Sequence, residues 1–153
     1  SMLAIGDYAP TLSIPTDTGI FSLAEQRGKK VVVFCFPRAQ TAARTQEAEQ
    51  FSALHDEFTV QNTVVIGVSK DKPAKQQKFR AKYGLTLLLG ADHETKFCEE
   101  FGVWVEKSMY GKTFMGIQRA SFIVDGDGRI AAIWPKVKVT GHAADVLEKL
   151  KAL

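Results

Sequence analysis

The hydrophobic positions along the chain change their period several times, which predicts alternating strands and helices. Residues 31–36 form a continuous apolar run rich in valine, typical of a strand that is buried on both faces. Residues 62–69 predict a second strand of this kind, and residues 87–89 a shorter third one. Between the first two strands, apolar residues recur every three or four positions and predict one helix over 41–58, which begins at Thr41 as its cap.

The segments before and after this central pattern predict further short elements. Two strands surround a turn near the start, and a hairpin closed by Asp-Gly-Asp-Gly precedes the last helix. No regular element is predicted for the polar stretch 106–116. The other expected elements are strands 11–14 and 20–23, a helix from Pro73 to Tyr83, a short helix begun by Asp92, hairpin strands 119–124 and 129–134, and a last helix capped by Thr140.

Buried strands joined by helical crossovers require an α/β layer architecture with helices on both faces of the sheet. The antiparallel hairpin makes that sheet mixed. We therefore expect a single domain over residues 3–153, in which a mixed central sheet is flanked by helices and preceded by an N-terminal β-hairpin. This order of elements matches a thioredoxin-like fold.

Composition and charge narrow the class of protein. Apolar residues make up 45% and charged residues 24% of the chain, which excludes a disordered chain, a collagen-like fibre and a disulfide-stapled miniprotein. No apolar run is long enough to span a bilayer, and we expect no signal peptide and a cytoplasmic location. The net charge of +3 comes from 20 basic and 17 acidic residues that look well mixed along the sequence, so we expect no nucleic-acid partner.

The cysteines and histidines form no recognisable ligand pattern. Cys35 and Cys98 are not in a C-x-x-C pair and have no zinc-type spacing with histidine, so we expect neither a metal nor a cofactor. In a cytosolic domain both are expected to be reduced packing residues. We interpret His55 as a half-buried packing residue and His142 as a residue at the cap or surface of the last helix.

Residues 36–45, at the corner where the first buried strand meets its helix, carry the most informative motif, Phe-Pro-Arg-Ala-x-Thr. With this motif the chain resembles the peroxiredoxin family, in its bacterioferritin-comigratory or peroxiredoxin Q branch. The resemblance covers nearly the whole chain. The other matching segments are Gly6-Asp7-x-Ala9-Pro10, Gly28-Lys29-Lys30, Gly67-Val68-Ser69-x-Asp71, Phe101-Gly102-Val103, Met109-Tyr110-Gly111-Lys112, Gly116-Ile117-x-Arg119-x-Ser121-Phe122 and Val137-Lys138-Val139-x-Gly141-His142.

The resemblance implies thiol-dependent reduction of hydroperoxides as an antioxidant activity. In the family the corner reads Pro-x-x-x-Thr-x-x-Cys, and the cysteine lies in the first helical turn, where a thiolate is favoured. The thiolate attacks the peroxide and becomes a sulfenic acid, which a resolving cysteine and a thioredoxin-like reductant return to the thiol. Pro37, Thr41 and Arg119 match the family's positions for the pocket proline, the orienting threonine and the arginine.

The chain departs from this pattern at the decisive position. Arg44 occupies the place of the peroxidatic cysteine, and Ala42, which lines the pocket beside Ala43, replaces the proline that commonly follows the threonine. The two positions used for a resolving cysteine hold Glu49 and Arg80. A guanidinium has no nucleophilic lone pair at neutral pH, so the family's chemistry cannot proceed at residue 44.

Three hypotheses about activity remain open from the sequence. The chain is a degenerate peroxiredoxin with a binding or regulatory role, or an active peroxidase that uses Cys35 or Cys98, or an otherwise working peroxidase in which residue 44 has been substituted. We expect a monomer or a weak dimer.

The charge at the corner leaves two alternatives for Arg44 itself. A cation in the first turn of a helix is unfavourable, and Arg119 points to the same place if the fold follows the family. Either Arg44 turns outward to solvent, or a small anion such as phosphate, sulfate or a carboxylate sits between the two guanidinium groups.

Overall fold

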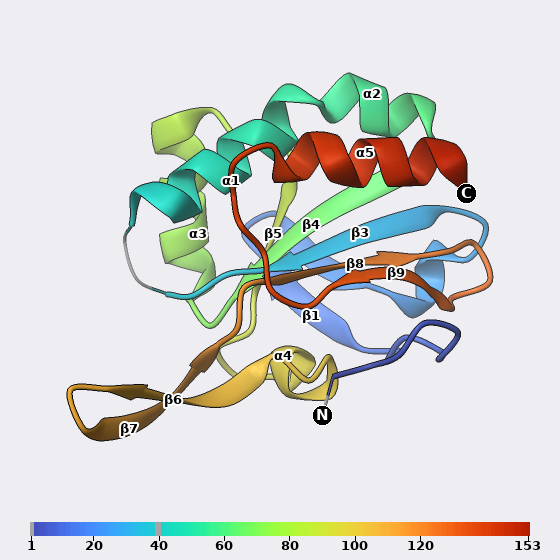
Figure 1. The fold of residues 1–153 in the computed structure, drawn as a ribbon. Coiled ribbons are helices and arrows are strands. Elements are labelled where there is room, and N and C mark those ends of the chain that lie inside the picture. Colours follow the sequence, from blue (N-terminus) through green and yellow to red (C-terminus); the bar gives the residue numbers. More distant parts are fainter. Residues whose placement is uncertain (1, 39–40) are drawn as a thin grey trace.

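The computed structural model describes residues 2–38 and 41–153 (Figure 1). Ala39 and Gln40, part of the expected corner motif, lie outside the described residues. The elements are β1 (Ser13–Thr16), β2 (Gly19–Ser22), η1 (Ala24–Gln26), β3 (Lys30–Cys35), α1 (Ala42–Ala53), α2 (His55–Val60), β4 (Thr63–Ser69), α3 (Pro73–Tyr83), β5 (Leu88–Ala91), α4 (Phe97–Glu100), β6 (Trp104–Met109), β7 (Lys112–Ile117), β8 (Ala120–Val124), β9 (Ile130–Trp134) and α5 (His142–Ala152).

A seven-stranded mixed sheet forms the centre of the molecule, in the order β2-β1-β5-β4-β3-β8-β9. Strands β3, β4 and β5 are parallel, whereas β8 pairs with β3, and β9 with β8, in the antiparallel sense. The N-terminal hairpin of β1 and β2 extends the sheet beyond β5. The mixed sheet and the N-terminal hairpin that the sequence predicts are confirmed.

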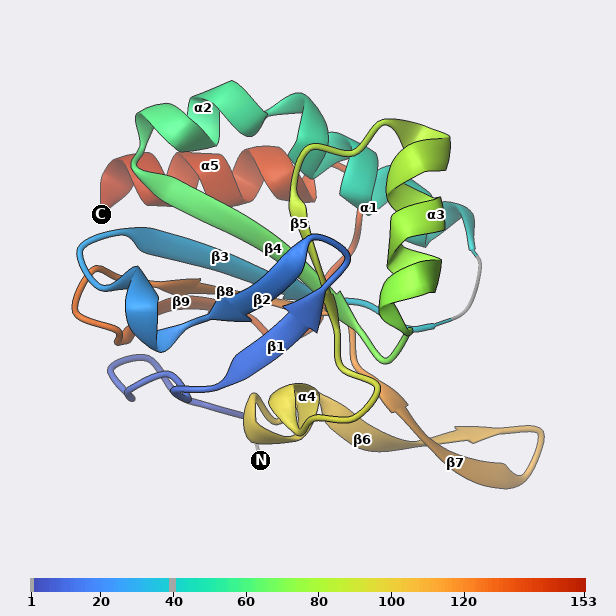
Figure 2. The same ribbon diagram turned by 180° about the vertical axis from the view of Figure 1, so that it is seen from behind.

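Strand β3 separates two hydrophobic cores because its alternate side chains point to opposite faces. Val31, Val33 and Cys35 pack against α4 and the N-terminal segment. Val32 and Phe34 pack against the layer formed by α1, α2, α3 and α5. Figures 1 and 2 show these helices on one face of the sheet and α4 on the other, so helices cover both faces as expected.

Two details of the expected helices are wrong. The helix predicted over 41–58 breaks at Leu54 into α1 and α2, where Thr86 donates a hydrogen bond to the carbonyl of Ser52 near the end of α1. The last helix begins after Gly141, which has the left-handed conformation, and Thr140 does not cap it.

The segment 106–116 forms part of the β6–β7 hairpin rather than an irregular loop. Its side chains are largely exposed on both faces, so no apolar alternation marks it in the sequence. Both figures show this hairpin extending away from the body of the protein.

Candidate functional site

The corner between β3 and α1 lies at the carboxyl edge of the parallel strands, where ligands collect in open α/β sheets. Thr41 is the N-cap of α1: its Oγ1 accepts a hydrogen bond from the backbone N–H of Arg44 at 3.3 Å. Arg44 is therefore in the first turn of the helix, as the motif predicts. Asp71 follows the end of the neighbouring strand β4 and reaches the same edge.

Arg44 is the largest fully buried side chain of the protein, with 1% of its surface exposed. Its Nη1 lies 3.1 Å from Oδ2 of Asp71 and donates a hydrogen bond of 3.1 Å to the carbonyl of Arg38. Its Nη2 donates to Oε1 of Gln76 at 3.4 Å. The guanidinium therefore has one buried ion-pair partner and two neutral acceptors.

Two aromatic rings complete the surroundings of this guanidinium. Its Cζ lies 4.3 Å from the ring centroid of Phe79 and 5.0 Å from that of Phe36. Contacts of this kind stabilise a cation by about 0.5–2 kcal/mol, more when the group is desolvated. Arg44 is thus integrated into the core that α1 and α3 form on the sheet.

Asp71 supplies most of the compensating charge. Its Oδ2 accepts a hydrogen bond from the Ser69 hydroxyl at 2.7 Å, and its Oδ1 lies 3.6 Å from the ammonium of Lys75 and 3.9 Å from Nε of Arg38. Burial lowers the pKa of Arg44, and the nearby Asp71 carboxylate acts in the opposite direction. An arginine stays protonated under these conditions because its ordinary pKa is so high.

Arg119 forms a second ion pair close by. Its Nη1 donates to Oε1 of Glu47, one turn after Arg44 on α1, at 2.5 Å. Burial raises the pKa of Glu47 to about 7, although the Arg119 charge opposes this shift. Oε2 of Glu47 has no hydrogen-bond partner among the described residues.

The alternative in which Arg44 turns outward to solvent is therefore wrong. The side chain does not turn outward, because Asp71, Gln76 and two aromatic rings hold it in the interior. The other alternative, a small anion between Arg44 and Arg119, stays a prediction, and each of the two guanidinium groups pairs with a carboxylate of its own.

The remaining positions carried over from the family are spread around the corner. Pro37 is half-buried at the end of β3, while Ala42 is exposed and Ala43 half-buried at the start of α1. Glu49 is exposed and lines a hollow of about 870 Å³ between α1 and α3, which Thr41 and Ala42 also line. Arg80, on α3, pairs with Asp17 through hydrogen bonds of 2.5 and 3.0 Å.

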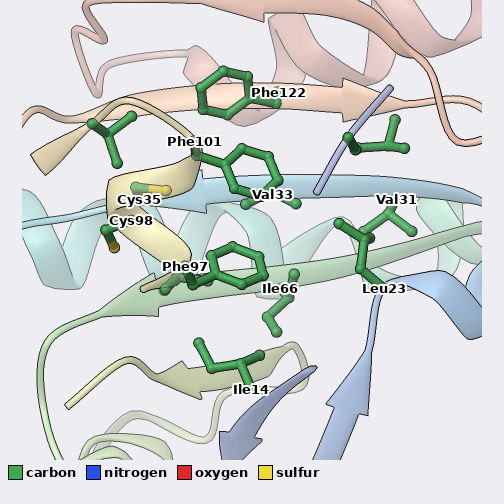
Figure 3. Close-up of a cluster of buried hydrophobic side chains, with 14 of the residues drawn as sticks. Ile14, Leu23, Val31, Val33, Cys35, Ile66, Phe97, Cys98, Phe101 and Phe122 are labelled. Atoms are coloured by element: carbon green, nitrogen blue, oxygen red, sulfur yellow. The ribbon is translucent and has the colours of Figure 1, made fainter. Parts of the chain in front are cut away.

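Cys35 and Cys98 lie on the opposite side of the sheet from α1. Both have 0% of their surface exposed and belong to the core that contains Phe97 and Phe101 (Figure 3). Interaction of the Cys98 thiol with the neighbouring Cys35, burial and the nearby Asp92 carboxylate all raise the pKa of Cys98 far above its usual range. The interpretation of both cysteines as buried packing residues is confirmed.

His55 differs from the sequence interpretation, whereas His142 lies at the start of α5, as expected, but not at the surface. His55 is exposed rather than half-buried. His142 is buried, and its Nε2 lies 2.7 Å from Oγ of Ser121. Burial lowers the pKa of His142 to about 4, so the ring is neutral at physiological pH.

The sequence analysis did not identify the residues that neutralise the two arginines. The sequence could have identified Asp71, because it follows the second buried strand and the carboxyl ends of the parallel strands β3 and β4 meet at one edge of the sheet. It could also have identified Glu47, since that residue lies three positions after Arg44 and so one turn along the same helix. Gln76 had no signal of its own before the position of α3 was known.

No group of three or more His, Cys, Asp or Glu side chains in residues 2–38 and 41–153 is arranged to hold a metal ion. Within the same ranges, every helix is too short or too polar to cross a membrane.

Comparison with known proteins gives a consistent result. Residues 5–133 match the model of the AhpC/TSA family. The chain is 40% identical over 149 residues to the putative peroxiredoxin bcp of Coxiella burnetii, covering 97% of this chain and 99% of that protein. It is also 40% identical over 150 residues to peroxiredoxin Bcp of Bacillus subtilis, covering 97% and 96% of the two chains.

Solved structures agree with the fold. A Cys-to-Ser variant of Xylella fastidiosa PrxQ superposes with a TM-score of 0.93 at 32% identity, covering 99% of this chain and 98% of that one. A structure of the Xanthomonas campestris bacterioferritin comigratory protein, from work on its alkyl peroxide reduction activity, gives a TM-score of 0.88 at 36% identity, covering 92% and 90%. The thioredoxin-like fold expected from the order of elements is confirmed.

Proposed function

The chain belongs to the AhpC/TSA family, with peroxiredoxins of the Bcp and PrxQ type among its relatives, and on this premise we propose that it does not itself reduce hydroperoxides. It keeps the fold and the helix cap at Thr41, but lacks the reacting thiol at residue 44. We infer a binding or regulatory role on the peroxiredoxin scaffold.

The observation that carries this proposal is the buried ion pair of Arg44 and Asp71. Reduction of a peroxide by this family requires a thiolate that accepts one oxygen and becomes a sulfenic acid. A guanidinium cannot act as this nucleophile. Because Arg44 also fills the interior beside Phe36 and Phe79, its side chain takes up the space next to the helix start.

A displaced cysteine is a poor substitute. The reactive form of cysteine is the thiolate, which needs an electropositive and partly exposed environment. Cys35 and Cys98 are both completely buried, and the Cys98 thiol, beside Cys35 and Asp92, has a raised pKa. These surroundings favour two inert thiols over an active peroxidase that uses either of them.

The third hypothesis, an Arg44 substitution in an otherwise working peroxidase, predicts that a cysteine at residue 44 restores turnover. Thr41 still caps the helix, which supports a pocket that keeps part of its machinery. Asp71 and Gln76 also pair with the two terminal nitrogens of the arginine, which supports a chain adapted to it, although its buried Nε has no partner among the described residues. Activity of a cysteine variant distinguishes an intact pocket from a diverged one.

Partners follow from this proposal. A protein that forms no sulfenic acid needs no thioredoxin-like reductant, and a hydroperoxide would not be turned over. A small anion between Arg44 and Arg119 loses its support because both charges are already paired. We propose the cytoplasm as the compartment, where two free thiols stay reduced.

The test is hydroperoxide consumption in the presence of a dithiol reductant, measured for hydrogen peroxide and an alkyl hydroperoxide. We expect no consumption above the protein-free rate for the unmodified chain. We expect clear turnover for Arg44→Cys and none for Arg44→Ser, which removes the same charge and leaves a side chain of similar size without a thiol.

Turnover by the unmodified protein that disappears in Cys35→Ala or Cys98→Ala would contradict the proposal. If Arg44→Cys folds, as judged by circular dichroism, and yet fails to turn over, the hypothesis of a recent substitution in a working pocket is wrong. The inactivity of the unmodified chain would then reflect a pocket that has diverged beyond residue 44.

A further inference from the structure

Helix α3 carries a concentration of positive charge that the sequence analysis overlooked. Residues 72–83 contain five basic residues and no acidic one, whereas the other 141 residues contain 15 basic and 17 acidic residues. The net positive charge of the chain is therefore located on this one helix and the residue before it. The sequence analysis described the charges as well mixed along the chain, and this description is wrong for residues 72–83.

The geometry of the helix places four of these charges on a common face. Lys72, Lys75, Lys78 and Lys82 are spaced by three or four residues, which makes them neighbours along the helix surface. All four are exposed. At a rise of 1.5 Å per residue they cover about 15 Å. Arg80 is separate from them, because it pairs with Asp17.

Most of this face has no compensating charge. Among the described residues, Lys72, Lys78 and Lys82 have no carboxylate within 4.0 Å, and Lys75 lies 3.6 Å from a single one, Asp71. That carboxylate already pairs with the buried Arg44 at 3.1 Å. Arg44 thus cancels the one negative charge that would otherwise offset the lysines.

The lysines border a hollow of about 510 Å³, within the range of ligand-binding cavities. Arg38 and Asp71 lie at one end of this hollow, and Phe79 and Tyr83 form an aromatic wall. The two rings pack edge to face, with centroids 5.6 Å apart and an interplanar angle of 75°. The hollow therefore offers a positive rim and an apolar side.

We propose that the α3 face, defined by Lys72, Lys75, Lys78 and Lys82 and the adjoining hollow, docks an acidic peptide segment of a partner protein. The carboxylates of such a segment meet the lysines, and one apolar or aromatic side chain lies against Tyr83 and the edge of Phe79. This goes beyond the proposed loss of peroxidase activity and does not depend on it.

The same features disfavour a nucleic acid. Phe79 is only 5% exposed and Tyr83 is half-buried, so the hollow offers no free aromatic face on which bases stack. A single row of lysines about 15 Å long also covers few phosphates, and the rest of the chain carries a slight excess of acidic residues. A short acidic segment fits both the length and the apolar side of the hollow.

The test is fluorescence anisotropy of the full chain with a short labelled peptide of aspartates and glutamates around one central phenylalanine. We expect saturable binding that weakens as salt concentration rises. The variant Lys78→Glu with Lys82→Glu should weaken binding about tenfold or more. The matched control is Lys149→Glu with Lys151→Glu, which makes the same charge change on the exposed side of α5 and should alter binding less than about twofold.

Two further probes separate the chemistry of the partner. Replacing the central phenylalanine of the peptide by alanine should weaken binding several-fold if the aromatic wall takes part. A single-stranded oligonucleotide of equal charge should bind more weakly than the peptide.

Equal affinity in the α3 and α5 variants, or no peptide binding at low salt, would overturn the proposal. Tighter binding of the oligonucleotide than of the peptide would overturn it in favour of a nucleic-acid surface. Circular dichroism of each variant ensures that a loss of binding is not a loss of fold.

Discussion

At the scale of single residues, the corner shows how a charge is accommodated in a place that disfavours it. The N-terminus of a helix carries a partial positive charge of about half a unit, which repels a cation such as Arg44. The side chain escapes this repulsion by extending inward to Asp71 and Gln76. Arg119 pairs separately with Glu47. Arg44 is thus held in the interior by its own carboxylate and amide partners.

The ion pair of Arg44 and Asp71 should therefore be important for stability. Removing one partner of a buried pair typically lowers the free energy of unfolding by 3–5 kcal/mol, so we expect about 3 kcal/mol for Arg44→Met, since Lys75 and Arg38 still face Asp71. Urea denaturation measures this loss. Lys151→Met, which breaks an exposed pair with Glu148, should cost less than about 1 kcal/mol.

A double-mutant cycle tests whether the two groups act together. Asp71→Asn in the Arg44→Met background should be less destabilising than in the unmodified chain, because the uncompensated carboxylate is then absent. Strict additivity of the two substitutions would contradict the buried ion pair.

Glu47 should make stability depend on pH. Its folded pKa of about 7 lies above the ordinary value of 4.5, so between these values the folded state holds a proton that the unfolded state releases. Stability from this group is thus present below pH 4.5 and is lost as pH rises to 7. Glu47→Gln should remove this pH dependence. As pH rises from 4.5 to 8, the free energy of unfolding of the variant should therefore rise by up to about 3 kcal/mol relative to that of the unmodified chain.

Unfolding curves at several pH values measure this change. Glu47→Gln also loses the ion pair with Arg119, which lowers its free energy of unfolding by a constant amount. The difference in the free energy of unfolding between the variant and the unmodified chain should still change with pH. Glu49→Gln on the same helix is the control, since Glu49 is exposed to solvent when folded and its profile should follow that of the unmodified chain. Parallel profiles for Glu47→Gln and the unmodified chain would contradict the shifted pKa.

At the scale of elements, the β6–β7 hairpin depends on its turn more than on packing. Met109 pairs with Lys112, so Tyr110 and Gly111 form a two-residue loop. Both have positive φ, 52° and 76°, as the favoured primed hairpin turns require. Tyr110 is 97% exposed, so no packing offsets the cost of a bulky residue in this conformation.

Tyr110→Asn should accordingly stabilise the hairpin by about 0.5–1 kcal/mol, because asparagine followed by glycine suits this turn. Hydrogen exchange of the β6 and β7 amides is the measurement, since the hairpin can open without global unfolding. Slower exchange is expected for Tyr110→Asn and faster exchange for Gly111→Ala. Unchanged exchange in both would show that the turn does not limit opening.

At the scale of the whole molecule, the sequence predicts those elements whose side chains form the buried core, because burial leaves a hydrophobic pattern. The run at residues 31–36 identified the central strand, and the strand and helix order identified the mixed sheet. The β6–β7 hairpin was not predicted because most side chains of residues 106–116 are exposed, so that no apolar alternation marks its strands. The break at Leu54 lies beside a hydrogen bond from Thr86 to Ser52, a contact between residues distant in sequence that no local pattern contains.

In the candidate site, the positions of the residues along the fold were predicted, whereas their contacts were not. The motif located Thr41, Arg44 and Arg119 at the corner, and the structure places them there. The orientation of Arg44 was wrong because it depends on a carboxylate from the next strand and a ring from α3. Local sequence predicts where a residue lies more readily than which distant group it meets.

The central claim is that no thiol of this protein reacts with a hydroperoxide. The most direct test is the intact mass of the folded, unmodified chain after exposure to a slight excess of hydrogen peroxide, with Arg44→Cys treated in parallel. We predict an unchanged mass for the unmodified chain and the gain of oxygen for the variant. An added oxygen that peptide mapping places on Cys35 or Cys98 rather than on the exposed Met109 or Met115, or the loss of two hydrogens through a disulfide between Cys35 and Cys98, in the unmodified chain would contradict the claim.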